Sequence, residues 1–166
     1  MSEIVVLGID PGSVCTGYGV IREVSGQAGM LAAGTIRTKA KQDLGARLGL
    51  IFTRLTEIIG KYRPSEAAVE NVFVAKAPAS ALKLGQARGA AIAACAVSGL
   101  PVFTYEPTKV KKSLVGVGRA EKKQVAFMVG QILGQKPDWA VDAADALAVA
   151  VCHLNERRFA RLVEGK

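Results

Sequence analysis

Two acidic residues each close a short apolar run, and both are candidates for chemistry. Asp10 follows the continuous apolar run at residues 4–9, and Glu70 closes the shorter run at residues 67–70. If these runs are buried strands, both carboxylates lie at strand carboxyl ends, where α/β proteins place ligand chemistry. The alternative is that each acid merely begins a turn, since the Asp-Pro-Gly sequence that starts at Asp10 is favourable in turns.

A second pair of acids, Asp142 and Asp145, opens an apolar segment that we predict to be a helix over residues 141–155. The i, i+3 spacing puts both carboxylates on one face, near the end where the helix dipole is positive. A structural role is the alternative, because Asp142 is a natural N-cap and Asp145 suits the first turn. The spacing alone leaves both interpretations open.

Together, the four carboxylates predict a site for divalent cations. A cluster of acids would repel phosphate in a chain of formal net charge +8, whereas four carboxylates balance the charge of two Mg²⁺ ions. Oxygen-only ligands favour Mg²⁺, with Mn²⁺ able to substitute, over zinc. A zinc site is not expected, because His153 is the single histidine and the three cysteines form no CxxC pair. Two Mg²⁺ ions for each chain are the expected cofactors.

Charge and composition limit the class of protein. The 166 residues are one domain's worth, and the content of 50% hydrophobic and 22% charged residues argues against disorder. Lys and Arg number 22 against 14 Asp and Glu, which predicts a polyanionic partner, although ribosomal and membrane-surface proteins share this surplus. Aromatic residues are only 5%, too few for a nonspecific single-strand binder. With no signal peptide, no long apolar span and no paired cysteines, we expect a cytoplasmic protein.

Apolar periodicity predicts the elements that position the acids. Three strands joined by short Gly-containing links indicate an antiparallel meander, and alternating helices and strands follow. This order predicts an α/β fold with a mixed sheet covered by helices. We expect one domain over residues 1–155 and a loosely attached basic tail over residues 156–166. The predicted strands cover residues 4–9, 15–23, 29–38, 67–70 and 101–105, and the predicted helices cover residues 44–58, 79–98, 108–114, 120–133 and 141–155.

Basic residues gather in two places. On the first helix, Arg47, Arg54 and Lys61 fall on a face away from the apolar stripe. A second group of basic residues lies between residues 109 and 123. Two glycines in this segment would let the backbone approach a phosphate closely. A solvated helix face is the alternative for this group, which consists of Lys109, Lys111, Lys112, Arg119, Lys122 and Lys123.

Several sequence blocks resemble the RuvC family of Holliday junction resolvases, in the same order and at matching intervals, up to about His153. They are GIDPGS at 8–13 with TGYGV at 16–20, VENVF at 69–73, SALKLGQARG at 80–89 and DAADALA at 142–148. The resemblance implies a ribonuclease H-like fold with a five-stranded mixed sheet flanked by helices. It also implies a homodimer that resolves four-way junction DNA in recombination and repair. Such an enzyme makes symmetric nicks with 5′-phosphate and 3′-hydroxyl ends, and works beside the RuvA–RuvB branch-migration complex.

The same resemblance implies roles for individual residues. The metal ligands and catalytic acids are Asp10, Glu70, Asp142 and Asp145, and Lys122 is a further catalytic residue. Phe73 is either a core residue or a probe that stacks on junction bases. The small-residue helix around residues 81–96 either packs only on its own sheet or also lies near a dimer two-fold axis. The expected DNA contacts are Phe73, Lys76, Lys83, Arg88, Lys111, Lys112, Arg119, Lys122 and Lys123.

Three other functions share part of the pattern. An actin-like ATPase has a similar Asp-Pro-Gly turn, but it normally needs a second domain to close over the nucleotide. A catalytically silent junction-binding protein would lack a reason to keep all four acids. A ribonuclease H that cuts RNA–DNA hybrids would share the chemistry, and only the family-specific blocks argue against it.

Overall fold

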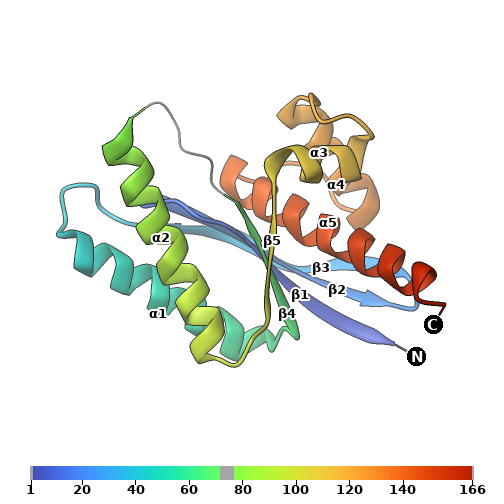
Figure 1. The fold of residues 1–166 in the computed structure, drawn as a ribbon, viewed down its shortest axis with the longest axis horizontal. Helices are drawn as coiled ribbons and strands as arrows, with labels where there is room; N and C mark the ends of the chain where they lie inside the picture. Colours follow the sequence, from blue (N-terminus) through green and yellow to red (C-terminus); the bar gives the residue numbers. More distant parts are fainter. Residues whose placement is uncertain (1, 72–76, 166) are drawn as a thin grey trace.

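The computed structural model describes residues 2–71 and 77–165, and within them the predicted order of elements is confirmed. The sheet consists of five strands and is flanked by five helices (Figure 1). The strands are β1 (Glu3–Asp10), β2 (Cys15–Val24), β3 (Gln27–Arg37), β4 (Glu66–Glu70) and β5 (Val102–Tyr105). The helices are α1 (Leu44–Tyr62), α2 (Pro78–Val97), α3 (Pro107–Val115), α4 (Lys122–Leu133) and α5 (Val141–Val163).

The sheet has the strand order β3-β2-β1-β4-β5 and is mixed, as predicted. Strands β1, β2 and β3 form the antiparallel meander, whereas β4 and β5 run parallel to β1. In the register of the parallel pair, Ile9 lies opposite Val69, so the next residues, which are the last of both strands, lie at the same edge of the sheet. Asp10 and Glu70 are those next residues, and the topology therefore brings them together.

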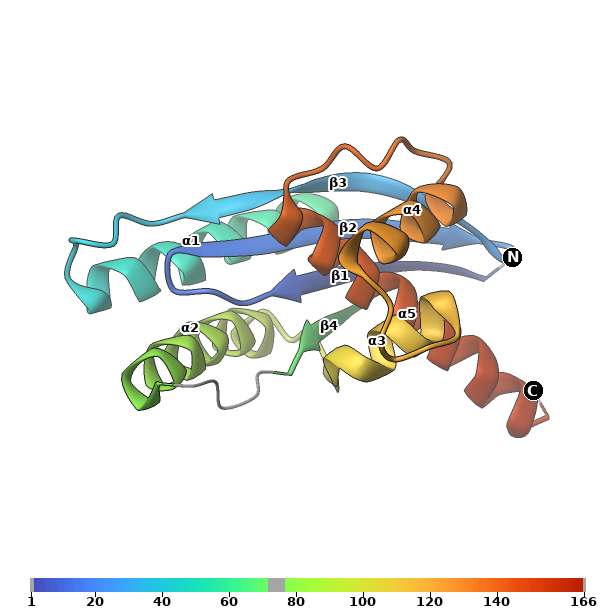
Figure 2. The ribbon, with the colours of Figure 1, turned by 90° about the horizontal axis from the view of Figure 1, so that it is seen from above.

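Helices cover both faces of the sheet, with α1 and α2 on one side and α3, α4 and α5 on the other (Figures 1 and 2). Strand residues alternate between the two cores. Val6 packs in the cluster with α5, while its neighbour Leu7 packs in the cluster with α1 and α2. In the described part of the chain, no helix combines the length and the apolar composition needed to cross a membrane.

The fold corrects two expectations, one about the exposure of Arg47 and one about the end of the last helix. Arg47 does not lie on a solvated helix face, since it is buried and donates hydrogen bonds to the Thr38 hydroxyl and the Ser13 carbonyl oxygen. The last helix continues to Val163 rather than ending near residue 155. Arg157 and Arg158 on this extension form ion pairs with Glu66 and Glu23 of the sheet, so this part of the chain is not loosely attached.

Candidate active site

Close packing of α5 on the sheet brings the second pair of acids to the first. Helix α5 lies across β1 and β2, and it can do so because glycines face it. A Cβ atom on Gly17 would lie 1.9 Å from the carbonyl oxygen of Asp142, and one on Gly8 would lie 2.0 Å from that of Ala146. Only glycine leaves room for the helix backbone at these two positions. Asp10 lies opposite Gly17 in the β1–β2 ladder, so the start of α5 lies beside Asp10.

Three of the predicted ligands converge closely. One carboxylate oxygen from each of Asp10, Asp142 and Asp145 lies within 4.8 Å of the other two. Glu70 adjoins this group, because its carboxyl group forms a hydrogen bond with Asp10. Asp142 is not the N-cap of α5, since the helix begins at Val141 with Ala140 at the cap. The capping explanation for Asp142 is therefore wrong.

Burial and mutual repulsion make this cluster hard to ionise. Desolvation is the largest cause that raises the pKa of Asp10 from 3.8 to about 8, and the charges of Glu70, Asp145 and Asp142 supply further parts of that shift. Desolvation also raises the pKa of Glu70, assisted by the charge of Asp145 and opposed by the hydrogen bond with Asp10 and by two lysines. A partly buried set of carboxylate oxygens that repel one another fits a hard divalent cation such as Mg²⁺. The residues present therefore suit the expected metal.

The two lysines next to the acids come from α3 and α4. Lys122 donates a hydrogen bond of 3.0 Å to Oδ2 of Asp145, and this contact is the main reason that the pKa of Lys122 is raised. Lys111 and Lys122 line a pocket of about 160 Å³ whose acidic members are Glu70 and Asp145. An ammonium group is thus held beside the acidic cluster, where a phosphate group would meet both charges.

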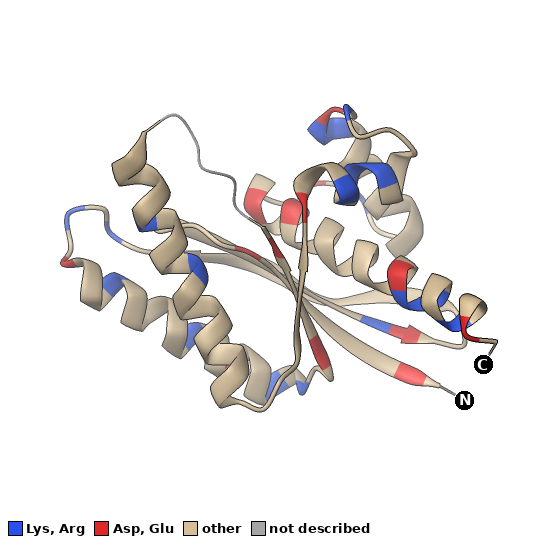
Figure 3. Ribbon diagram, in the orientation of Figure 1, with Lys and Arg blue, Asp and Glu red and all other residues tan. Residues whose placement is uncertain are grey.

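The other predicted DNA contacts within the described residues lie on α2 and around α3 and α4, where Lys and Arg are marked in Figure 3. Lys112 and Arg119 line an open groove of about 820 Å³ on the α3 side, and Lys123 is exposed near the start of α4. Lys83 is exposed on α2, whereas Arg88 already donates a hydrogen bond of 3.1 Å to the Thr104 hydroxyl. Phe73 and Lys76 lie outside the described residues.

Residues that support the loop after Asp10 were missed by the sequence patterns. The Thr16 hydroxyl donates to the Gly12 carbonyl oxygen, and Thr38 donates to that of Ser13. Buried Arg47 donates to the same Ser13 oxygen at 2.8 Å. Apolar periodicity cannot find such residues, because an arginine on a helix is normally exposed.

One thiol also adjoins the site. Cys15 is a free thiol, and it lies close enough to Asp142 for a side-chain hydrogen bond. Burial raises the pKa of Cys15, and the contact with Asp142 adds to the effect. The thiol is therefore held in its neutral form beside the acids.

Known proteins share the sequence and the fold of this chain. The family model described as "Crossover junction endodeoxyribonuclease RuvC" matches residues 6–153. A protein of that name from Solidesulfovibrio magneticus is 60% identical over 158 residues, which are 95% of this chain and 94% of the relative. Another, from Oleidesulfovibrio alaskensis, is 58% identical over 98% of this chain and 97% of its own length.

Among solved structures, that of Thermus thermophilus RuvC in complex with Holliday junction substrate has a TM-score of 0.89 and 38% identity. The match covers 95% of this chain and 96% of that one. This similarity confirms the ribonuclease H-like fold that the sequence blocks implied. The chain belongs to the RuvC family of crossover junction endodeoxyribonucleases.

Proposed function

We propose that the protein resolves Holliday junctions by nicking two opposed DNA strands symmetrically, in recombination and repair. The observation that carries this proposal is the cluster of Asp10, Asp142 and Asp145 with Glu70 and Lys122 beside it. The similarity to proteins named crossover junction endodeoxyribonuclease and to the T. thermophilus complex with Holliday junction substrate supports a junction as the substrate. An ATPase activity or a silent junction-binding role is not favoured. All four acids lie close together in this chain, and the chain belongs to a family of nucleases.

The four acids would hold Mg²⁺, two ions for each chain, and Mn²⁺ would substitute. When bound, such ions lower the pKa of an attacking water and stabilise the departing oxygen of the phosphodiester. Asp10 lies beside Glu70, and one of its oxygens lies within 4.8 Å of the pair on α5, so it would hold cations together with both groups. Lys122 would stabilise the charge on the scissile phosphate, oriented by its hydrogen bond to Asp145. The products would carry 5′-phosphate and 3′-hydroxyl ends.

The basic residues around the cluster would hold the DNA backbone. Lys111, Lys112, Arg119, Lys122 and Lys123 would contact the strand on the α3–α4 side. Lys83 and Arg88 of α2 would contact it on the other side, and Arg88 would first exchange its bond to Thr104 for phosphate. Phe73 and Lys76, in the segment between β4 and α2, would complete the surface, with Phe73 stacking on a base.

Two active sites related by symmetry would explain paired nicks in opposed strands, so we also propose a homodimer in which α2 lies near the two-fold axis. The RuvA–RuvB complex would be its partner on the junction. The three free thiols, Cys15, Cys95 and Cys152, suit a reducing compartment such as the cytoplasm.

The direct test compares a labelled four-way junction with a linear duplex of the same sequence, with Mg²⁺ and with EDTA. We expect symmetric nicks in the junction alone and only with Mg²⁺. Asp10→Asn should bind the junction without cutting it. Binding without cutting by the wild-type protein would contradict the nuclease activity, and equal cutting of both DNAs would contradict junction specificity.

A further inference from the structure

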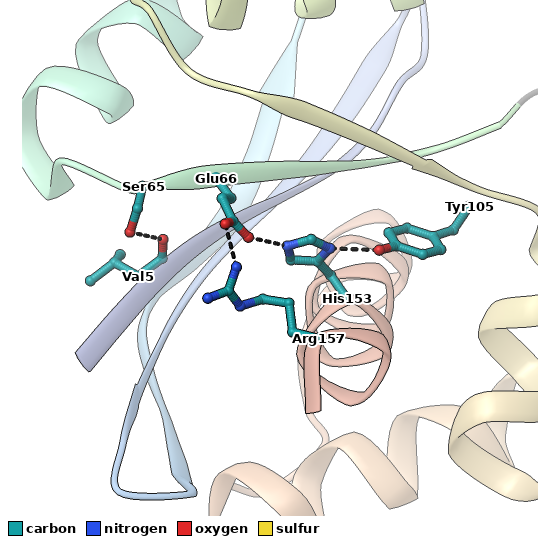
Figure 4. Close-up of polar contacts among 6 residues, drawn as sticks. All are labelled: Val5, Ser65, Glu66, Tyr105, His153 and Arg157. Carbon is teal, nitrogen blue, oxygen red and sulfur yellow. Dashed lines mark hydrogen bonds and ion pairs between the residues drawn. The ribbon is translucent and has the colours of Figure 1, made fainter. Parts of the chain in front are cut away.

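A polar network lies between α5 and the strands β4 and β5 (Figure 4). Its centre is His153, whose side chain is almost fully buried. One ring nitrogen, Nε2, lies 2.5 Å from a carboxylate oxygen of Glu66, and the other, Nδ1, lies 2.6 Å from the Tyr105 hydroxyl. Arg157, one turn further along α5, pairs with the second carboxylate oxygen of Glu66.

The partners determine the direction of each hydrogen bond. A carboxylate can only accept, so Nε2 of His153 carries the proton and donates to Glu66. Burial lowers the pKa of His153, which leaves the ring neutral, and Nδ1 then accepts from the hydroxyl of Tyr105. Burial raises the pKa of Tyr105 to about 12, so this hydroxyl keeps its proton. Each ring nitrogen of His153 therefore has a hydrogen-bond partner, and the donors and acceptors can be assigned in only one way.

The network joins the elements that carry the catalytic acids. His153 lies on α5, about 12 Å along the helix from Asp145. Glu66 begins β4, the strand that ends at Glu70. Tyr105 lies opposite Glu70 in the β4–β5 ladder. Hydrogen bonds from one side chain on α5 thus reach the first residue of β4 and the residue of β5 that lies opposite Glu70.

Apolar packing and the polar network both hold α5 on the sheet, but only the network consists of directional contacts. The residues that face the sheet include small ones, such as Ala146 and Ala150, and they lie over Gly8. Hydrophobic attraction is not directional, whereas a hydrogen bond requires its donor and acceptor to keep their distance and angle. A shift of α5 by one residue, about 1.5 Å along its axis, would break the hydrogen bonds of His153.

We infer that His153 is a positioning residue of the active site, which sets the position of α5 relative to β4 through Glu66 and Tyr105. In this way, it fixes the distance between the acids of α5 and Glu70. The inference rests on the proposed function, in which these acids bind divalent cations together. Loss of the network should weaken cation binding and cleavage, while the surface that binds DNA stays intact.

The experiment uses the whole protein and three substitutions in the network. Tyr105→Phe removes one hydroxyl and keeps the ring, and His153→Leu removes both hydrogen bonds. His153→Gln restores a donor and an acceptor at similar spacing. Ile51→Val is the matched control, because Ile51 is a buried core residue of α1 on the opposite face of the sheet. Cation affinity is measured without cleavage, from the increase in Tm that a series of Mg²⁺ concentrations produces.

We expect Tyr105→Phe and His153→Leu to raise the Kd for Mg²⁺ and the Mg²⁺ requirement of cleavage by about tenfold. Junction affinity in EDTA should stay at the wild-type value, and His153→Gln should recover most of the cation affinity. Ile51→Val should lower Tm without changing the Kd. A wild-type Kd in both Tyr105→Phe and His153→Leu, or an equal change in Ile51→Val, would overturn the inference. If the wild-type protein itself shows no Mg²⁺-dependent cleavage, the proposed function fails instead.

Discussion

Asp10 ionises with difficulty in the metal-free protein, because it is partly buried among three other carboxylates. The pKa of Asp10 is 3.8 ordinarily and about 8 in the folded protein. Between these two pH values, the folded state therefore keeps a proton that the unfolded state releases. The free energy of unfolding therefore falls as pH rises through this window, and is highest below its lower end. In EDTA, we expect Tm to fall by up to about 3 °C per pH unit between these values.

The same measurement on Asp10→Asn isolates the effect of this residue. Asparagine does not ionise, so the variant should lose most of the slope and should melt higher than the wild type at pH 8. Saturating Mg²⁺ should also reverse the slope in the wild type, since bound cations stabilise the ionised acids. An identical slope in wild type and Asp10→Asn would show that another group causes it.

Lys122 is the basic residue with the most direct contact to the cluster, through its 3.0 Å bond to Asp145. Lys122→Ala removes an ammonium group held where charge develops on the phosphate, so cleavage should fall by about a hundredfold. Junction binding, which is shared among many basic residues, should fall only slightly. Gel-shift titrations in EDTA and single-turnover cleavage in Mg²⁺ measure the two effects.

Lys123→Ala is the control for Lys122→Ala, because it removes the same charge from the next residue of α4. Its effects on binding and on cleavage should be similar in size. If Lys122→Ala also reduced both by the same factor, Lys122 would be a backbone contact and not a catalytic residue.

Single residues were predictable from the sequence where a local pattern marked them. Asp10 and Glu70 stood out because each closes an apolar run. Arg47 did not, because its burial depends on the loop that packs against it from residues 13 and 38. The contact of Cys15 with Asp142 also joins distant parts of the chain, and no spacing in the sequence indicates it.

At the scale of elements, the distance between α5 and the sheet determines the geometry of the site. Gly17 sets it most directly, because a Cβ atom there would overlap the backbone of Asp142. In Gly17→Ala, the start of α5 must move away, and the acids of its first turn move with it. We expect cleavage to fall by about a hundredfold or more and Tm to fall by several degrees.

Gly29→Ala makes the same chemical change on β3 at a position where a Cβ atom meets nothing within 4 Å. It should leave cleavage and Tm near the wild-type values. Single-turnover cleavage and thermal melting of both variants give the comparison. Wild-type cleavage by Gly17→Ala would mean that α5 can move without disturbing the acids.

Elements were predicted well where apolar periodicity is strong, and less well at their ends. The helix α5 was expected to stop near residue 155, where the apolar pattern gives way to arginines. It continues to Val163 because Arg157 and Arg158 find acidic partners on β4 and β2. Such partners are distant in the sequence, so a local pattern cannot reveal them. The same limit applies to the close approach of α5, which depends on glycines of two other strands.

At the scale of the whole molecule, a chain of formal net charge +8 surrounds a small acidic site. The general basic character predicted a polyanionic partner, but it does not indicate how many subunits would hold a junction. The proposed arrangement of a junction on two subunits requires identical sites related by symmetry, and a single chain supplies one site. The proposed homodimer therefore makes a prediction about the number of nicks.

Dimers that contain one wild-type and one Asp10→Asn subunit separate paired nicking from single nicking. The substrate is a supercoiled plasmid with an extruded cruciform, which one nick relaxes and two opposed nicks linearise. If each subunit cuts one strand with its own acids, mixed dimers purified through two different tags should give nicked circles. The wild-type dimer should give linear DNA, and the doubly substituted dimer should leave the plasmid supercoiled. Linear DNA from the mixed dimer would mean that one active site cuts both strands in turn, and the two-fold model would then be wrong.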